Sequence, residues 1–117
     1  MSPRREDRVE PPAVVLHHAP GAPSAVLREV SAGAEEEGVP LRLQRVPDGA
    51  AVALGHAAAR DSRLSVGVGV SADGAVAVHH AQLPADRPAL AVRDGTPADW
   101  RRAGRTAARV VTGLPLQ

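Results

Sequence analysis

Residues 66–86, VGVGVSADGAVAVHHAQLPAD, decide the fold of this chain. Two apolar runs with β-branched valines at alternate positions flank the turn residues SADG at 71–74. Because Asp-Gly can supply the turn and the positive backbone angle that a tight connection needs, the stretch predicts a β-hairpin in the core of a sheet. We therefore expect at least one strand of this protein to run antiparallel to its neighbour.

The length and composition limit the number of domains, the kind of core and the partners that this protein can have. A chain of 117 residues is long enough for one domain with a single core, and it is small enough to depend on a partner. Trp100 is the only aromatic residue among Phe, Trp and Tyr, so the core must be built from Val, Leu and Ala. The formal net charge of +1 argues against nonspecific nucleic-acid binding, which would need a dominant positive field.

Two segments differ in character along the chain. Residues 1–12 mix both charge signs with three prolines and no periodicity, which is typical of a disordered tail. Residues 13–117 carry the apolar patterns and form the expected single α/β domain. No signal-like run and no long apolar span is present in the sequence, so we expect a soluble, cytoplasmic protein with no membrane contact.

Strand and helix patterns alternate through the domain. Gly38 is placed to end the first helix, Asp48 to cap the second, and Thr96 with Asp99 to open the last with a capping box. The expected strands are 13–16, 41–45 (an edge), the two arms of the hairpin and a weak strand at 90–92; the expected helices are 24–37, 49–60 and one beginning near 97. The order βαβαββ(β)α predicts an α/β layer fold with helices on both faces of a sheet.

The search for catalytic groups is largely negative. The chain contains no Lys, Cys or Tyr, and Gly67 and Gly69 lie inside a strand rather than between a strand and a helix. We interpret these glycines as positions that allow a helix to approach the sheet closely, not as a phosphate loop. The pairs His17-His18 and His79-His80 should emerge at opposite ends of the sheet, so we interpret them as surface or loop histidines and not as metal ligands.

Three consecutive carboxylates end the first predicted helix. Glu35, Glu36 and Glu37 face the negative end of the helix dipole, which disfavours them there. They form either a solvated acidic helix end, partly offset by Arg28 and Arg42, or a carboxylate offered to a cation or a basic patch across an interface.

The last predicted helix carries a small-residue stripe on one face and a row of arginines on another. Arg101, Arg105 and Arg109 repeat at four-residue spacing. We interpret the row as a solvated face or as a surface for an acidic protein partner. An RNA-binding module is the alternative, although the chain lacks the aromatic residues on which unpaired bases stack.

Three motifs in order carry a resemblance to a known family: GAEEEGVP at 33–40, the stretch 66–86, and AGRTAARVV at 103–111. From about Val14 to Leu116 the chain resembles the small subunit of diol/glycerol dehydratase reactivase, the reactivating factor of the coenzyme B12 dehydratases. The resemblance implies a three-layer α/β/α fold with a five-stranded mixed sheet and one antiparallel strand, like the anticodon-binding-domain topology. Thr106 and Thr112 stand where the family usually has Asn and Lys.

The resemblance also implies a role. The chain would be a chaperone-like, non-catalytic partner of an ATPase large subunit, in an α2β2 heterotetramer, with ATP bound by the large subunit. It would exchange with the dehydratase medium subunit so that damaged cobalamin is released. The family's Gly-x-Glu-Glu-x-Gly-Val-Pro motif supplies one glutamate to a divalent ion, Mg or Ca, at the subunit junction; aligned on Gly33 and Gly38, that residue is Glu36.

The rival interpretations remain open at this point. The nearest is a dehydratase medium-subunit-like chain that contacts cobalamin directly; an RNA-binding module follows. The resemblance implies no catalytic residue and no cofactor held by this chain alone. It places the protein in the cytoplasm, with a bacterial microcompartment as the second option.

Overall fold

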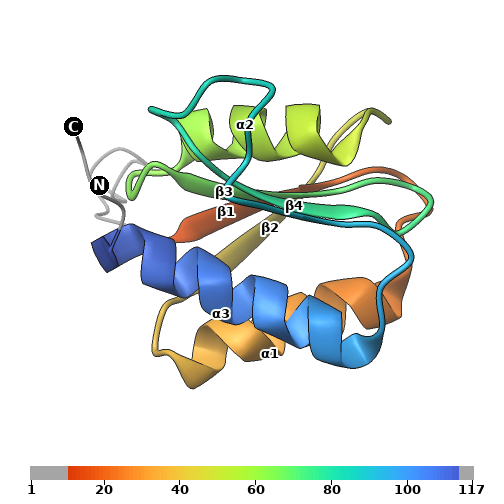
Figure 1. Ribbon diagram of the computed structural model, residues 1–117, viewed down its shortest axis with the longest axis horizontal. Helices are drawn as coiled ribbons and strands as arrows, with labels where there is room; N and C mark the ends of the chain where they lie inside the picture. Colours follow the sequence, from red (N-terminus) through yellow and green to blue (C-terminus); the bar gives the residue numbers. More distant parts are fainter. Residues whose placement is uncertain (1–10, 114–117) are drawn as a thin grey trace, which may run out of the picture.

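The computed structural model describes residues 11–113 as three layers (Figure 1). A five-stranded sheet lies between α2 on one side and the pair α1 and α3 on the other. In chain order the elements are β1 (Val14–His18), α1 (Ser24–Glu36), β2 (Leu41–Arg45), α2 (Ala51–Asp61), β3 (Val66–Val70), β4 (Val76–His80), β5 (Leu90–Val92) and α3 (Pro97–Gly113). Residues 1–10 of the predicted tail lie outside the described residues, so that expectation stays a prediction.

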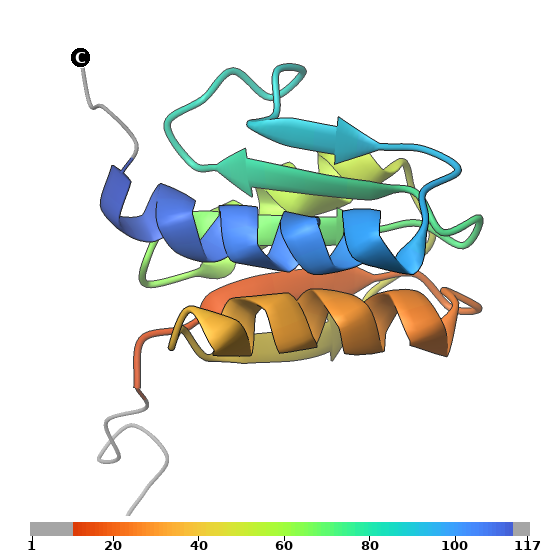
Figure 2. The same ribbon diagram turned by 60° about the horizontal axis from the view of Figure 1, so that its bottom comes forward.

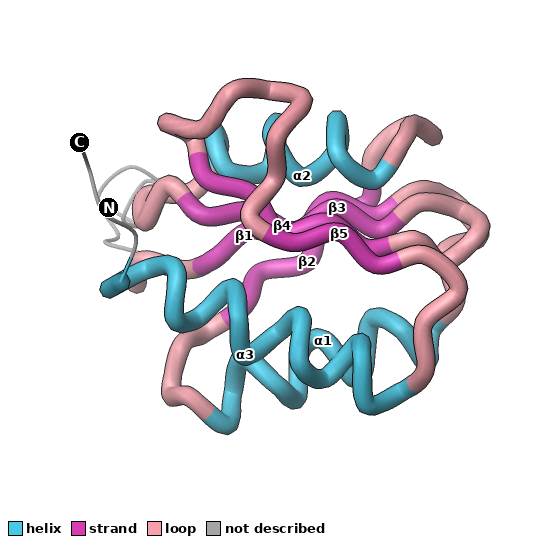
Figure 3. The backbone as a smooth tube through the Cα atoms, in the orientation of Figure 1, coloured by secondary structure: helices cyan, strands magenta, loops and turns pink. Residues whose placement is uncertain are grey.

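The sheet is mixed, with strand order β2-β1-β3-β4-β5 (Figure 3). β1 pairs in parallel with both β2 and β3, whereas β4 pairs antiparallel with β3 and with β5. β4 is therefore the one strand that opposes the rest, and both the predicted hairpin and the predicted fold class are confirmed. Gly74 has a φ of +87° in the turn, as the Asp-Gly motif predicts.

α2 packs closely against the sheet because β3 has glycines, which carry no side chain, at the positions that α2 contacts. A Cβ atom on Gly67 would lie 2.1 Å from the backbone nitrogen of Ala59, and one on Gly69 would lie 2.1 Å from the carbonyl oxygen of Ala51. Any side chain at these positions would push the helix away. This confirms the packing interpretation of the two glycines.

Local sequence explains the ends of two helices. α1 ends in a Schellman motif, in which Gly38, at a φ of +76°, donates to the carbonyl of Glu35 and Val39 donates to that of Ala34. α3 begins with the predicted capping box: the Thr96 N–H donates to Asp99 Oδ2, and the Asp99 N–H donates to Thr96 Oγ1.

The predicted cap of α2 is wrong. The helix begins at Ala51 after Ala50, which makes no side-chain cap, and Asp48 Oδ1 accepts from the N–H of Gly49 instead. Asp48 lies three residues before the first residue of the helix, and its carboxylate binds the adjacent N–H rather than the helix terminus.

The core is made mainly of valine and alanine. Val14 and Leu16 of β1 pack with the buried valines of β3 and β4, and Val26 and Val30 of α1 cover them. β2 lies at the edge and is mostly exposed, with 43% of Leu43 accessible. Among residues 11–113, no helix combines the length and hydropathy needed to cross a bilayer.

Candidate functional site

The helices α1 and α3 run side by side under the sheet (Figure 2) and touch backbone to backbone. A Cβ atom on Gly33 would lie 2.0 Å from the carbonyl oxygen of Arg101, and one on Gly104 would lie 2.0 Å from that of Val30. Each helix therefore presents a glycine to the backbone of the other. This contact fixes which surface residues of the two helices become neighbours.

Charged side chains line the outer edge of this contact, and we call them the α1–α3 charge cluster. Its members are Glu29 and Glu36 of α1, Glu37 directly after α1, and Arg101, Arg105 and Arg109 of α3. Glu36 is its centre. Arg101 Nη1 donates to Glu36 Oε2 at 2.6 Å, and Arg105 Nη1 donates to Glu36 Oε1 at 3.0 Å. Both carboxylate oxygens of Glu36 are therefore bound by guanidinium groups.

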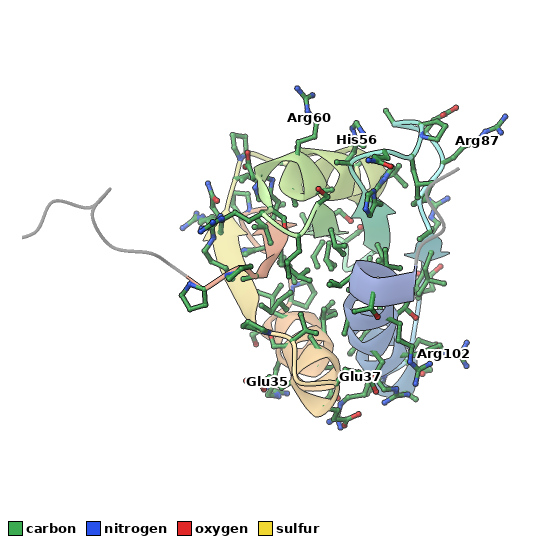
Figure 4. All side chains as sticks on the ribbon, turned by 90° about the vertical axis from the view of Figure 1, so that its left-hand side faces the viewer. Glu35, Glu37, His56, Arg60, Arg87 and Arg102 are labelled. Carbon is green, nitrogen blue, oxygen red and sulfur yellow. The ribbon has the colours of Figure 1, made fainter. Side chains whose placement is uncertain are left out.

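The remaining pairs extend the cluster along both helices. Arg101 also donates from Nε to Glu29 Oε1 at 2.9 Å, so this arginine bridges two glutamates that lie about two helical turns apart on α1. Arg109 Nε lies 3.7 Å from Glu37 Oε1. Figure 4 shows Glu35 and Glu37 at the end of α1, and Arg102 on the side of α3 that faces away from α1.

The cluster changes the acidity of its central residue. Hydrogen bonds from Arg101 and then Arg105 hold the pKa of Glu36 below its ordinary value. The hydrogen bonds to Glu36 and Glu29 raise the pKa of Arg101 above its ordinary value. Glu36 is thus a firmly ionised carboxylate, although 42% of its side chain is accessible.

The predicted arginine row is a solvated face only in part, because Arg109 is exposed whereas Arg101 and Arg105 are half-buried. Arg101 and Arg105 are paired within the chain, and the expected counter-ions of the acidic helix end, Arg28 and Arg42, are replaced by arginines of α3. Sequence spacing could not reveal this pairing, because the partners lie 65 and 69 residues apart. The pairing also occupies Arg101 and Arg105, two of the three arginines that would have to bind phosphate groups on an RNA-binding surface.

The residues of this chain alone do not fit a divalent metal ion. Among residues 11–113, no three or more His, Asp or Glu side chains converge in a way that could hold one. Glu36 supplies a single carboxylate, and two positive guanidinium groups lie against it. A hard cation needs several oxygen ligands and is repelled by neighbouring positive charge, so the other ligands would have to come from another molecule.

The histidine pairs lie at opposite ends of the sheet, as predicted. The expectation that they are surface or loop residues is wrong for His17, His79 and His80, which are buried, whereas His18 is half-buried. His17 is buried next to Gly69 of β3, and its Nε2 lies 3.1 Å from Asp61 Oδ2. His79 and His80 are buried at the other end, where β3 begins. Three of these four histidines are therefore part of the packed interior of the sheet.

His79 fastens the long loop that follows β4. Its Nδ1 accepts from the N–H of His80 at 3.0 Å, so Nε2 carries the proton and donates to the carbonyl of Ala85 at 3.0 Å. The ring lies 4.7 Å from that of His56 on α2, centroid to centroid. Both ring nitrogens of His79 therefore have hydrogen-bond partners, which gives the residue a structural role.

A hollow of about 720 Å³ lies beside the start of α2, between the hairpin turn and β5. Its carboxylates serve the local backbone: Asp48 accepts from Gly49, and Asp73 accepts from the Ser71 hydroxyl and the N–H of Ala75. The hollow therefore offers no paired acid and base, and the α1–α3 charge cluster is the stronger candidate site.

The whole described fold has known relatives. A solved structure of glycerol dehydratase reactivase superposes with a TM-score of 0.84 at 40% identity, covering 92% of this chain and 97% of that one. A structure of a diol dehydratase-reactivating factor complexed with ADP and Mg²⁺ superposes with a TM-score of 0.81 at 36% identity, over 92% and 99% of the two chains. The sequence profile of the dehydratase medium subunit family matches residues 11–117.

Two curated relatives agree with these structures. A probable glycerol dehydratase-reactivating factor small subunit of Citrobacter freundii is 41% identical, over 87% of this chain and 89% of its own length. A diol dehydratase-reactivating factor small subunit of Klebsiella michiganensis is 38% identical, over 86% of each chain. The chain belongs to the family of dehydratase-reactivating factor small subunits. The predicted family is thereby confirmed.

A reactivating factor small subunit is named for its place in a larger assembly, which suggests a non-catalytic subunit. In this family member, the α1–α3 charge cluster is the surface feature that remains to be assigned.

Proposed function

We propose that this chain is the small subunit of a reactivating factor for a B12-dependent diol or glycerol dehydratase. In this role it binds an ATPase large subunit in an α2β2 heterotetramer and exchanges with the dehydratase medium subunit, so that damaged cobalamin leaves. The observation that carries the proposal is the superposition on a glycerol dehydratase reactivase chain, at a TM-score of 0.84 over 97% of that chain.

The chain itself performs no chemistry in this proposal. ATP is bound and hydrolysed by the large subunit, and the small subunit supplies a docking surface. Two observations support this part of the proposal. The sequence lacks Lys, Cys and Tyr, and the carboxylates in the hollow beside α2 bind local backbone groups. We place the protein in the cytoplasm or inside a bacterial microcompartment, where such a dehydratase would be found.

Glu36 is the residue we propose at the junction with the large subunit. It would be one ligand of a Mg or Ca ion whose other ligands the large subunit supplies. The partly exposed position of Glu36 and its ionised state support this role. The relative solved with ADP and Mg²⁺ is consistent with a divalent ion in the complex.

Co-expression with a candidate large subunit tests the proposal. We expect the two chains to co-purify, and the purified complex to restore activity to a cobalamin-inactivated dehydratase in the presence of ATP, Mg²⁺ and fresh coenzyme. The small subunit alone should neither hydrolyse ATP nor restore activity. Failure to co-purify with any large subunit encoded beside a diol or glycerol dehydratase would contradict the proposal.

The medium-subunit-like role is the second candidate, because the medium subunit profile matches residues 11–117. Such a chain would contact cobalamin directly. Titration of the purified chain with cyanocobalamin separates the two functions: tight, micromolar or better binding would favour the medium-subunit role, and its absence favours the reactivating factor.

A further inference from the structure

Glu36 meets two demands that cannot be satisfied together. As proposed above, it ligates a divalent ion at the junction with the large subunit. In the free chain both of its oxygens accept hydrogen bonds, one from Arg101 at 2.6 Å and one from Arg105 at 3.0 Å. A cation approaching Glu36 meets two positive groups on the oxygens that it needs.

The helix contact keeps the backbone positions of these arginines next to Glu36. Gly33 lies against the backbone of Arg101 and Arg105, so Glu36, one turn after Gly33, lies beside these two residues, which stand on either side of Gly104 in the chain. Neither helix can move away without losing that contact. Glu36 and the two arginines can therefore separate by rotation of their side chains, with the backbone unchanged.

The two arginines differ in what they lose when Glu36 turns away. Arg101 keeps Glu29, to which Nε and Nη2 both lie at 2.9 Å. Glu36 is the one ion-pair partner of Arg105 that the described part of the chain provides. Both guanidinium groups are partly accessible, 37% for Arg101 and 32% for Arg105, so a docking protein can reach the site.

We propose that Arg101 and Arg105 act as an internal counter-ion latch that holds Glu36 in the free chain and competes with the divalent ion for it. This inference rests on the proposed junction role of Glu36. The latch lowers the affinity of the isolated chain for divalent ions, so that Glu36 binds one only where the large subunit adds its own ligands. Arg101 and Arg105 are thus positioning residues that act through Glu36.

The test measures how assembly with the large subunit depends on Mg²⁺. The affinity of the two subunits is determined over a Mg²⁺ series for the wild type and for Arg105→Gln, which leaves the Glu29 pair intact. We expect Arg105→Gln to lower the Mg²⁺ concentration for half-maximal assembly at least about fivefold, a coupling of ordinary size. Arg102→Gln is the matched control, because Arg102 points away from α1 (Figure 4), and Arg105→Lys should largely restore the wild-type value.

A second measurement uses the free chain alone. The carboxyl pKa of Glu36, followed by NMR, should rise in Arg105→Gln toward its ordinary value, since one of the two hydrogen bonds that lower it is lost. A merely structural role for Arg105 would change the melting temperature and leave both the pKa and the Mg²⁺ midpoint unaltered.

The outcomes separate the latch from the junction role. If Glu36→Gln abolishes the Mg²⁺ dependence of assembly while Arg105→Gln leaves the midpoint unchanged, the latch is overturned and the junction role stands. If Glu36→Gln assembles with the same Mg²⁺ dependence as the wild type, or the wild type shows none, the junction role fails and the latch fails with it.

Discussion

Gly33 and Gly104 form a reciprocal contact: each lies against the backbone of the helix that carries the other, so that a Cβ atom on either would come within 2.0 Å of a carbonyl oxygen. Two helices that cross a sheet in parallel are thereby held closer than side chains of ordinary size allow. The contact aligns Glu36 with Arg101 and Arg105, and the candidate site depends on it.

Gly104→Ala should destabilise the chain strongly. The added methyl group meets backbone, which cannot rotate away, so we expect a loss at the upper end of about 1–3 kcal/mol and a fall in melting temperature of about 5 °C or more. Thermal unfolding followed by circular dichroism measures the effect. Gly113→Ala is the control, because nothing lies within 4 Å of the added Cβ. Equal melting temperatures for the two variants would contradict the close contact.

Gly67→Ala should separate α2 from the sheet. A Cβ atom there would lie 2.1 Å from the backbone nitrogen of Ala59 in the last turn of α2, so the helix must shift or loosen. We expect faster hydrogen exchange in α2 than in α1, together with a lower melting temperature. Uniform protection of both helices at the wild-type level would show that β3 tolerates a side chain here.

His79→Ala should release the loop after β4. The change removes a fully buried ring and the hydrogen bond to the Ala85 carbonyl, for an expected loss of about 3 kcal/mol. Hydrogen exchange should rise most at Ala89, whose N–H donates to the carbonyl of Val78 across the loop. His18→Ala, at a less buried position in β1, is the control; a similar effect of both variants would argue against a specific loop contact.

His80 should make the protein less stable in weak acid. Burial, and secondarily the nearby His79, holds the pKa of His80 below its ordinary value of about 6.5. The unfolded chain then binds more protons, so the contribution of His80 is fully present above about pH 6.5 and is lost as the pH falls through that value toward the folded pKa. Urea unfolding of His80→Gln between pH 5 and 8 should show a flatter pH dependence than the wild type; identical slopes would exclude this residue as the cause.

Glu36→Gln should lower the stability of the free chain. From the sequence alone we would expect no change or a slight gain, since a carboxylate is unfavourable at the end of a helix. The two arginine hydrogen bonds reverse that expectation. Because the pKa of Glu36 is lowered, its contribution is present above its unfolded pKa and is lost as the pH falls through the folded value.

The comparison for that prediction is Glu35→Gln, which removes a neighbouring charge from the same helix end. Urea unfolding at pH 7 and pH 3 should show a larger difference in stability between Glu36→Gln and the wild type at the higher pH than at the lower one. A loss of equal size for Glu35→Gln would mean that diffuse charge, and not the arginine pair, stabilises the helix end.

The family, the fold class and most element ends could be predicted from the sequence because they depend on residues that are close in the chain. The Asp73-Gly74 turn, the Gly38 helix end and the Thr96–Asp99 capping box each involve partners within a few residues, so local chemistry determines them. The cap predicted at Asp48 is wrong because the helix begins three residues later, at Ala51, and the Asp48 carboxylate accepts from the adjacent N–H of Gly49.

Only the tertiary structure decided which charges meet and which histidines are buried. Glu36 and Arg101 lie 65 residues apart, and their pairing follows from the Gly33–Gly104 contact, which a linear pattern does not reveal. His79 is buried because β4 is covered by α2 on that face and by its own following loop. The sequence by itself determined the sheet, its hairpin and the acidic end of α1. Packing between distant segments determined that arginines of α3 neutralise this acidic helix end, because two glycines bring α1 and α3 close enough for their side chains to pair.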